Sequence, residues 1–166
     1  MSAIPQPSFE APASVPTRTP YVEVWRNTTQ NIPNTSWTAL SWTEAFSDSH
    51  GFWAATAPTR LTVPSGLSGL YAYEFQWEAA GSGLAAATFL AVRLNGTLQV
   101  ASTSAGSVSS EGRMRISGHR LMDGGSYIEG CLYQASGGAY IDQSFAVGSD
   151  DPASPFMNLT RLAALS

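Results

Sequence analysis

Residues 70–78 constrain the fold of this chain more than any other segment. Their sequence, LYAYEFQWE, places an aromatic side chain at every second position and mostly polar side chains between them. Because successive side chains of a β-strand point to opposite faces, the pattern predicts a strand with one aromatic face. Such a face suits the interior of a β-sandwich better than the alternative, a sugar-stacking surface. The aromatic residues are Tyr71, Tyr73, Phe75 and Trp77.

Similar short patterns, separated by turn residues, follow one another along the chain. Asn95-Gly96 is the strongest turn signal, because both central residues of a type I′ hairpin turn need a positive φ. It predicts a hairpin between residues 86–94, which include Phe89, and residues 97–101. About nine or ten strands are expected, with no helix and no internal repeat. The predicted fold is therefore all-β, an antiparallel β-sandwich over residues 21–166.

Residues 1–20 differ from the rest and are predicted to form an extended arm. Five prolines restrict φ there and favour extended or polyproline II backbone. Sparse apolar residues offer anchors for docking on a neighbouring surface, although the alternative is a frayed terminus. The residues that we expect to bind a partner through this arm are Ile4, Pro5, Pro7, Phe9 and Val15.

Charge and composition exclude several classes of function. The formal net charge is −4, only 12% of residues are charged, and all eight cations are arginine. This balance gives no basic footprint for nucleic acid and no polybasic membrane anchor. The arm lacks the apolar run of a signal peptide, and no segment approaches about eighteen uninterrupted apolar residues. We therefore expect neither a nucleic acid nor a membrane as partner, and synthesis in the host cytoplasm without export.

Residues that could carry catalysis or bind a metal are few. Asp48 and His50 share a turn, but Asp and Ser commonly stabilise turns by bonding local backbone. His119 has no second histidine at ligand spacing, and Cys131 is the only cysteine, so we interpret it as a small buried hydrophobe. The sequence predicts no enzyme, no catalytic or metal-binding residue and no cofactor.

Several segments, taken in order, resemble a known family. Residues 61–64 (LTVP), 69–73 (GLYAY), 94–96 (LNG), 121–128 (LMDGGSYI) and 156–159 (FMNL) are similar to the jelly roll of complement-component heads and the tumour necrosis factor superfamily. The resemblance covers roughly residues 21–162. It implies a jelly-roll fold and a homotrimer, in which a flat aromatic and aliphatic face packs around a threefold axis. We expect Tyr71, Tyr73, Phe75, Trp77 and Phe89 to form the core and trimer strands.

The first segments of the sandwich show a second resemblance, which indicates the kind of organism and the function. The opening Val24-Trp25-Arg26, followed by Gln30-Asn31-Ile32-Pro33 and Thr35, resembles stand-alone members found among tailed-bacteriophage virion proteins, and the lack of lysine suits a GC-rich genome. The leading hypothesis is a trimeric decoration or cement protein on the capsid surface. Its arm would lie across the lattice of major capsid proteins, and three arms per trimer would add avidity.

Other functions remain open at this stage. The main alternative is a receptor- or glycan-binding head of a phage tail or head fibre, contacting the host through loops 27–34, 102–110 and 150–155. These loops contain no aromatic residue. A bacterial surface or spore-coat domain of the same fold is a further alternative, which the missing export signal disfavours.

Overall fold

A computed structural model describes residues 18–78, 87–105, 113–142 and 155–165, and this part of the chain is all-β. It contains twelve strands and no helix, and therefore no helix able to cross a membrane. The predicted all-β antiparallel sandwich is confirmed, while the predicted arm lies outside the described residues except for Arg18, Thr19 and Pro20. The strands are β1 (Tyr21–Trp25), β2 (Gln30–Ile32), β3 (Thr38–Ala39), β4 (Glu44–Asp48), β5 (Leu61–Thr62), β6 (Gly69–Glu78), β7 (Thr88–Leu94), β8 (Leu98–Ala105), β9 (Arg113–Met122), β10 (Tyr127–Gln134), β11 (Tyr140–Asp142) and β12 (Phe156–Ala164).

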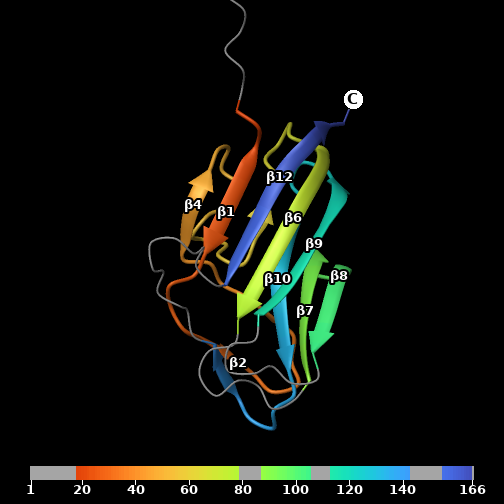
Figure 1. Cartoon of the computed structure of the whole chain (residues 1–166). Coiled ribbons are helices and arrows are strands. Elements are labelled where there is room, and N and C mark those ends of the chain that lie inside the picture. Colours follow the sequence, from red (N-terminus) through yellow and green to blue (C-terminus); the bar gives the residue numbers. More distant parts are fainter. Residues whose placement is uncertain (1–17, 79–86, 106–112, 143–154, 166) are drawn as a thin grey trace, which may run out of the picture.

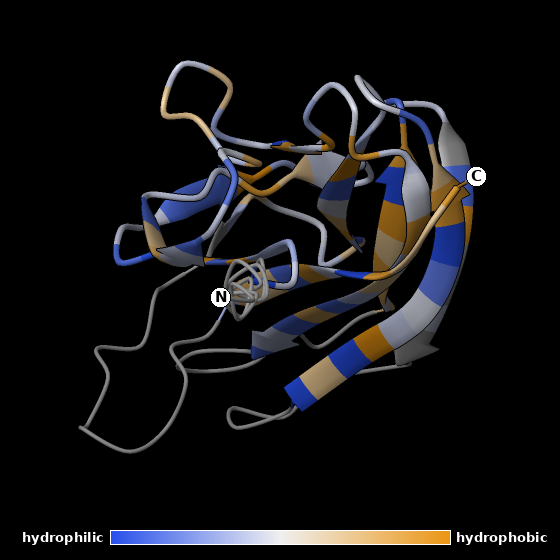
Figure 2. Ribbon diagram, turned by 90° about the horizontal axis from the view of Figure 1, so that it is seen from above, coloured by the Kyte–Doolittle hydropathy of each residue, from blue (hydrophilic) through white to orange (hydrophobic). Residues whose placement is uncertain are grey.

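Two sheets form the sandwich (Figure 1). The first sheet has the order β4-β1-β12-β6-β9, and the second has the order β3-β10-β7-β8, with β5 also paired to β10. A two-stranded sheet of β2 and β11 lies at the end of the molecule remote from the start of β1. Viewed along the sandwich, the strands carry alternating hydrophobic and hydrophilic residues (Figure 2). This alternation is what two sheets packed face to face require, because each presents one face to the shared core.

The core contains the aromatic face predicted for β6. Tyr71, Tyr73, Phe75 and Trp77 are at most 4% exposed. The Phe75 ring packs edge-on against Trp42 at 6.1 Å between centroids, and the Tyr71 hydroxyl donates a 2.6 Å hydrogen bond to a backbone carbonyl. These four side chains are buried in the core of a single copy, so they are not available for contact with a second copy. Phe89 differs, because it is half-buried on the outer face of the second sheet.

The hairpin predicted at Asn95-Gly96 joins β7 to β8. Asn95 has φ +51° and Gly96 has φ +75°, the combination that a type I′ turn needs. The Asn95 side chain also accepts a 3.0 Å hydrogen bond from the Tyr127 amide, while its own amide donates to the Tyr127 carbonyl at 2.9 Å. The turn is thus tied to the start of β10, which pairs with β7 over its whole length.

Some elements differ from the sequence prediction. Residues 27–34, predicted as a polar loop, contain β2, which pairs with β11. Residues 102–105, predicted as part of a loop, extend β8, since backbone pairing with β7 needs no large side chains. An alternating pattern over residues 35–42 also predicts a strand, but only the two-residue β3 forms there, after Thr35 turns the chain with φ +54°. The predicted loop at 150–155 lies outside the described residues except for Pro155.

Gly69 is required by the close approach of β6 and β12. A Cβ at this position would overlap the backbone carbonyl oxygen of Ala163 and lie 2.8 Å from Arg161 Nε. We expect Gly69→Ala to destabilise the fold by about 2 kcal/mol, because the paired strands must separate. Thermal unfolding should shift down by roughly 5 °C. Gly138→Ala is the matched control, since Gly138 has nothing within 4 Å of its Cβ position, and an equal loss in both variants would contradict the expectation.

Candidate functional site

The turn that holds Asp48 and His50 is a structural device. Asp48 Oδ1 accepts hydrogen bonds from the amides of His50, Gly51 and Phe52 at 3.2, 2.8 and 3.0 Å, and Oδ2 accepts one from Trp53 at 2.9 Å. The carboxylate therefore stabilises the turn, as local Asp chemistry predicts, and makes no hydrogen bond to the imidazole. His50 Nδ1 instead lies 2.6 Å from its neighbour Ser49. Asp48 is therefore not hydrogen-bonded to the Ser49–His50 pair, as the acid of a catalytic triad would be.

The described residues contain no group of three or more His, Cys, Asp or Glu side chains that could hold a metal ion. His119 is exposed on β9, opposite Ala72 of β6. It has no partner in catalysis or metal binding among the residues whose placement is described.

Arg26 and Gln30 form a buried hydrogen-bond network that connects the end of β1, the start of β2 and the end of β3. Arg26 is 1% exposed, and its Nη1 donates a 2.6 Å hydrogen bond to Gln30 Oε1. The same Oε1 accepts a hydrogen bond from the Ser41 amide at 2.9 Å, while Gln30 Nε2 donates to the Ala39 carbonyl. Burial lowers the pKa of Arg26 to about 10, so the guanidinium remains charged at neutral pH. Arg26 and Gln30, which belong to the segments that resemble virion proteins, therefore stabilise the fold.

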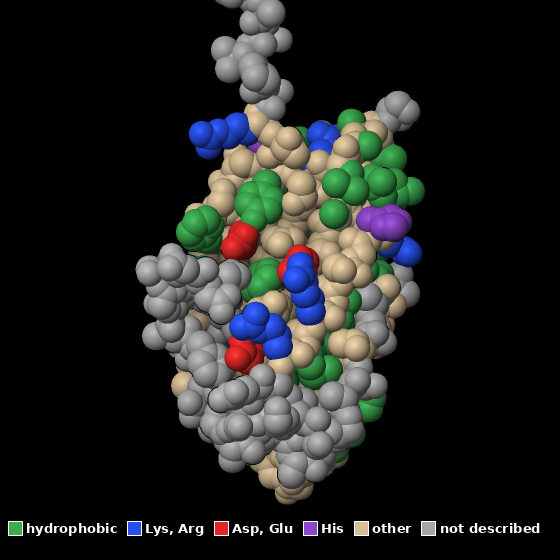
Figure 3. All heavy atoms as spheres, viewed as in Figure 1, with side chains coloured by type: hydrophobic (Ala, Val, Ile, Leu, Met, Phe, Trp, Pro, Cys, Tyr) green, Lys and Arg blue, Asp and Glu red, His purple; other side chains and the backbone are tan. Residues whose placement is uncertain are grey.

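Hydrophobic side chains gather on the outer face of the first sheet, near the C-terminal end (Figure 3). Leu121 on β9 and Leu162 on β12 are 59% and 57% exposed, and Leu165 is 44% exposed. Half-buried Leu70 of β6 lies opposite Leu121 in the strand register. These four leucines form the terminal apolar patch. Isolated exposed leucines are ordinary on protein surfaces, but a group on neighbouring strands is a candidate interaction surface.

Farther along the same face the surface becomes charged. Arg115 Nη2 lies 2.6 Å from Glu74, and Arg113 Nη2 lies 3.0 Å from Glu78, across the β6 and β9 pair. In Figure 3, blue and red side chains lie side by side on this face. Exposed pairs of this kind stabilise a fold little, and they keep this half of the face hydrated. Across β6 and β9 the apolar character is therefore confined to the end that holds the terminal apolar patch, while Phe46 on β4 is exposed separately at the other edge of the sheet.

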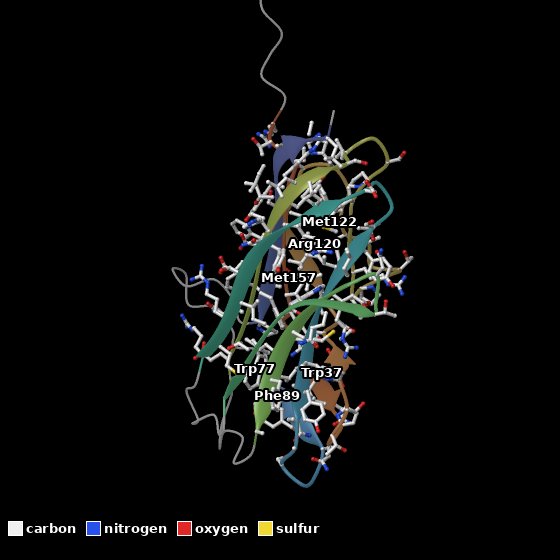
Figure 4. The ribbon with its side chains drawn as sticks, turned by 90° about the vertical axis from the view of Figure 1, so that its right-hand side faces the viewer. Trp37, Trp77, Phe89, Arg120, Met122 and Met157 are labelled. Atoms are coloured by element: carbon white, nitrogen blue, oxygen red, sulfur yellow. The ribbon has the colours of Figure 1, made fainter. Side chains whose placement is uncertain are left out.

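A second candidate surface lies on the outer face of the second sheet. Phe89 of β7 and Tyr133 of β10 are partners in the register, with their rings edge to face at 5.6 Å. Trp37, which precedes β3, packs on both rings at centroid distances of 6.4 and 5.5 Å. The guanidinium of Arg93 lies 5.1 Å from the Trp37 ring centroid. We name these four residues the aromatic platform; Figure 4 shows Trp37 and Phe89 near the end remote from the start of β1.

Arg93 is the charged member of the aromatic platform and lacks a carboxylate partner among the described residues. Glu129 stands opposite Arg93 in the register. However, Glu129 Oε1 accepts a 2.8 Å hydrogen bond from the Thr59 hydroxyl and pairs with Arg60 at 3.4 Å. Within the part of the chain described, the guanidinium forms no ion pair and lies over the Trp37 indole in a cation–π arrangement, which leaves it able to pair with a carboxylate.

The turn at Thr35 sets the position of Trp37. A β-branched residue with φ +54° is rare, and the left-handed conformation costs about 1–2 kcal/mol. The Thr35 amide donates a 2.8 Å hydrogen bond to the Gln134 carbonyl, and Asn34 Oδ1 accepts one from Gly137 at 3.0 Å. These bonds hold the turn, after which Trp37 reaches the rings of the second sheet.

Cys131 lies beside the aromatic platform and is 1% exposed. Burial raises the pKa of its thiol to about 11. At pH 8 only about one thiol in a thousand is ionised, and the thiolate is the reactive form. We expect iodoacetamide to leave Cys131 unmodified in the native protein and to alkylate it fully in urea, as measured by intact mass. Rapid alkylation of the native protein at pH 8 would contradict this placement.

Comparisons with known proteins identify the fold. No protein-family model and no curated protein sequence gives a significant match. Among solved structures, the globular domain of a zebrafish complement 1qA protein matches with a TM-score of 0.58 and 12% identity, covering 88% of this chain and 99% of that domain. Murine APRIL matches with a TM-score of 0.61 and 12% identity, covering 86% of this chain and 98% of that chain. The fold is the jelly roll of complement heads and tumour-necrosis-factor-like proteins.

On this jelly roll the predicted site residues that the structure describes lie in two places. Tyr71, Tyr73, Phe75 and Trp77 lie in the core, and Phe89 lies in the aromatic platform. The arm residues Ile4, Pro5, Pro7, Phe9 and Val15 lie outside the described residues. Sequence reasoning missed both the platform and the patch. Phe89 stood in a predicted strand, but only the register shows that it meets Tyr133, and only the ring packing shows that Trp37 joins them.

Proposed function

We propose that this protein is a non-enzymatic structural protein of a bacteriophage virion, a homotrimer that decorates the capsid surface and stabilises it. The observation that carries the proposal is the terminal apolar patch on a jelly roll of the complement-head type. The patch supports association of copies, the fold supports a trimer, and the arm supplies the contact with the capsid.

The trimer is supported by the fold together with the surface. Members of this fold family are typically trimers, and the same sheet face in each copy can close a ring around a threefold axis. The terminal apolar patch gives that face exposed leucines to bury, and burial of apolar surface contributes about 25 cal/mol per Å². The core aromatics of β6 take no part in this contact, because one copy already buries them.

Attachment to the lattice of major capsid proteins rests on the arm. Its prolines favour extended backbone, which loses less entropy on docking than a flexible tail. Ile4, Pro5 and Pro7 at its start are the anchors that we assign to the lattice. Three arms on one trimer convert weak contacts into a durable attachment, since each later contact forms at high effective concentration. The absence of lysine from the sequence agrees with a GC-rich host.

The alternative, a receptor- or glycan-binding head of a tail or head fibre, places the same trimer on another part of the virion. The loop at 27–34, one of its expected contact regions, contains β2, whose residue Ile32 is buried. This reduces the loop surface available for a host receptor.

Two measurements test the proposal together. Light scattering of the purified full chain gives its mass in solution, and co-sedimentation with undecorated heads measures capsid binding. A trimer that sediments with heads supports a decoration protein. A trimer that ignores heads but binds host cells would assign the alternative function, and a monomer would overturn the trimer.

A further inference from the structure

The aromatic platform combines flat apolar surface with unused polar groups. The Trp37 indole N–H and the Tyr133 hydroxyl make no hydrogen bond to any described residue, and Arg93 has no carboxylate partner there. Trp37, Phe89 and Tyr133 are only half-buried. A matching ligand must offer apolar rings or chains, hydrogen-bond acceptors and a negative charge.

An extended proline-rich segment has these properties. Each proline removes one N–H donor, and polyproline II backbone leaves the carbonyl acceptors free of internal hydrogen bonds. Aromatic surfaces that carry free N–H and O–H donors are the known means of binding these segments. An acidic residue within the segment would pair with the guanidinium of Arg93.

The chain itself contains such a segment in residues 9–16. Polyproline II has three residues per turn, so Phe9, Pro12 and Val15 share one edge, which is entirely apolar. Glu10 belongs to the neighbouring edge, and the third edge carries the small residues Ala11 and Ser14. The segment thus pairs an apolar edge with one carboxylate, as the platform requires.

The segment cannot reach the aromatic platform of its own copy. It is followed by Arg18 and β1, and the start of β1 lies at the end of the molecule opposite Trp37 and Phe89 (Figures 1 and 4). From Val15 to Arg18 the chain spans only about 10 Å, whereas the platform lies on the other sheet, beyond the core. We propose that residues 9–16 of one copy bind the aromatic platform of a second copy, with Glu10 paired to Arg93.

This contact between copies goes beyond the proposed capsid function and does not depend on it. It uses Phe9 and Val15 and leaves Ile4, Pro5 and Pro7 for the lattice. An arm that begins at one end of a copy and ends on the far end of another would link trimers to one another. In a decoration layer of this kind, the arms would connect neighbouring trimers directly to one another.

A photo-crosslink on the full-length chain tests the contact. Phe9 is replaced by p-benzoylphenylalanine, the protein is irradiated below saturation, and a denaturing gel separates covalent dimers, which need two copies, from chains linked within themselves. The dimer should carry the crosslink on peptides that contain Trp37, Phe89 or Tyr133. The same crosslinker at Ala11, on the opposite edge, is the matched control and should give a much lower dimer yield.

A charge exchange supplies the decisive comparison. Glu10→Arg or Arg93→Glu alone should lower the dimer yield about tenfold, and the two together should restore it. Near-ultraviolet circular dichroism of each variant verifies the fold. Crosslinks confined to single chains, crosslinks mapped to another surface, or a double variant no better than the single ones would each overturn the proposal.

Discussion

Leu121→Asp combined with Leu162→Asp will convert the proposed trimer into monomers. Both side chains are more than half exposed in one copy, so the substitutions leave the core intact. In the proposed trimer they are buried, and a carboxylate placed in an apolar interface without a partner costs several kcal/mol. The association constant should fall by at least about a thousandfold. Light scattering should give the mass of one chain, while circular dichroism remains that of the native fold.

Phe46→Asp is the matched control for this result. Phe46 on β4 is 80% exposed, more than either leucine, but it lies on the opposite edge strand of the first sheet, away from the terminal apolar patch. The control should remain a trimer. A double leucine variant that stays trimeric would show that the copies associate through another surface, and a monomeric Phe46→Asp would extend the interface to β4.

The core could be predicted from the sequence because its signal is local. In a strand the period of two assigns each side chain to a face, so residues 71, 73, 75 and 77 had to share one. The Asn95-Gly96 turn was equally local, since two adjacent residues determine its type. Both predictions needed no knowledge of which strands pair.

The candidate surfaces could not be predicted in this way, because they depend on register between distant segments. Phe89 and Tyr133 meet because β7 pairs with β10 in one particular alignment. Trp37 joins them through the left-handed turn at Thr35, a conformation that the sequence of a threonine does not suggest. The terminal apolar patch likewise needs β9 and β12 on either side of β6. No short window of sequence contains these relations.

The resemblance and the structure contribute different parts of the functional argument. This chain shares the jelly-roll fold with the complement and APRIL structures at only 12% sequence identity. A shared fold does not assign a function. The proposed function depends instead on the surfaces that this chain adds to the fold. Substitutions in the terminal apolar patch test the association of copies. Separate substitutions in the arm test attachment to the capsid lattice.

Ile4→Asp combined with Pro7→Asp will abolish binding to undecorated heads and leave the trimer intact. The two substitutions remove an apolar anchor and a conformational restraint from the start of each arm. Because all three arms of a trimer change at once, avidity is lost together with the single-arm affinity, and binding should fall by about a hundredfold or more. Co-sedimentation with heads measures the loss, and light scattering verifies the trimer.

Ser2→Asp combined with Ser8→Asp separates apolar anchoring from charge. This variant adds the same two carboxylates to the same stretch of the arm but keeps Ile4 and Pro7. It should bind heads nearly as the native protein does, since exposed charges are largely screened at physiological salt. Equal losses in both variants would attribute binding to charge. Undiminished binding of the Ile4 and Pro7 variant would remove the arm from the capsid contact and leave attachment to the sandwich itself.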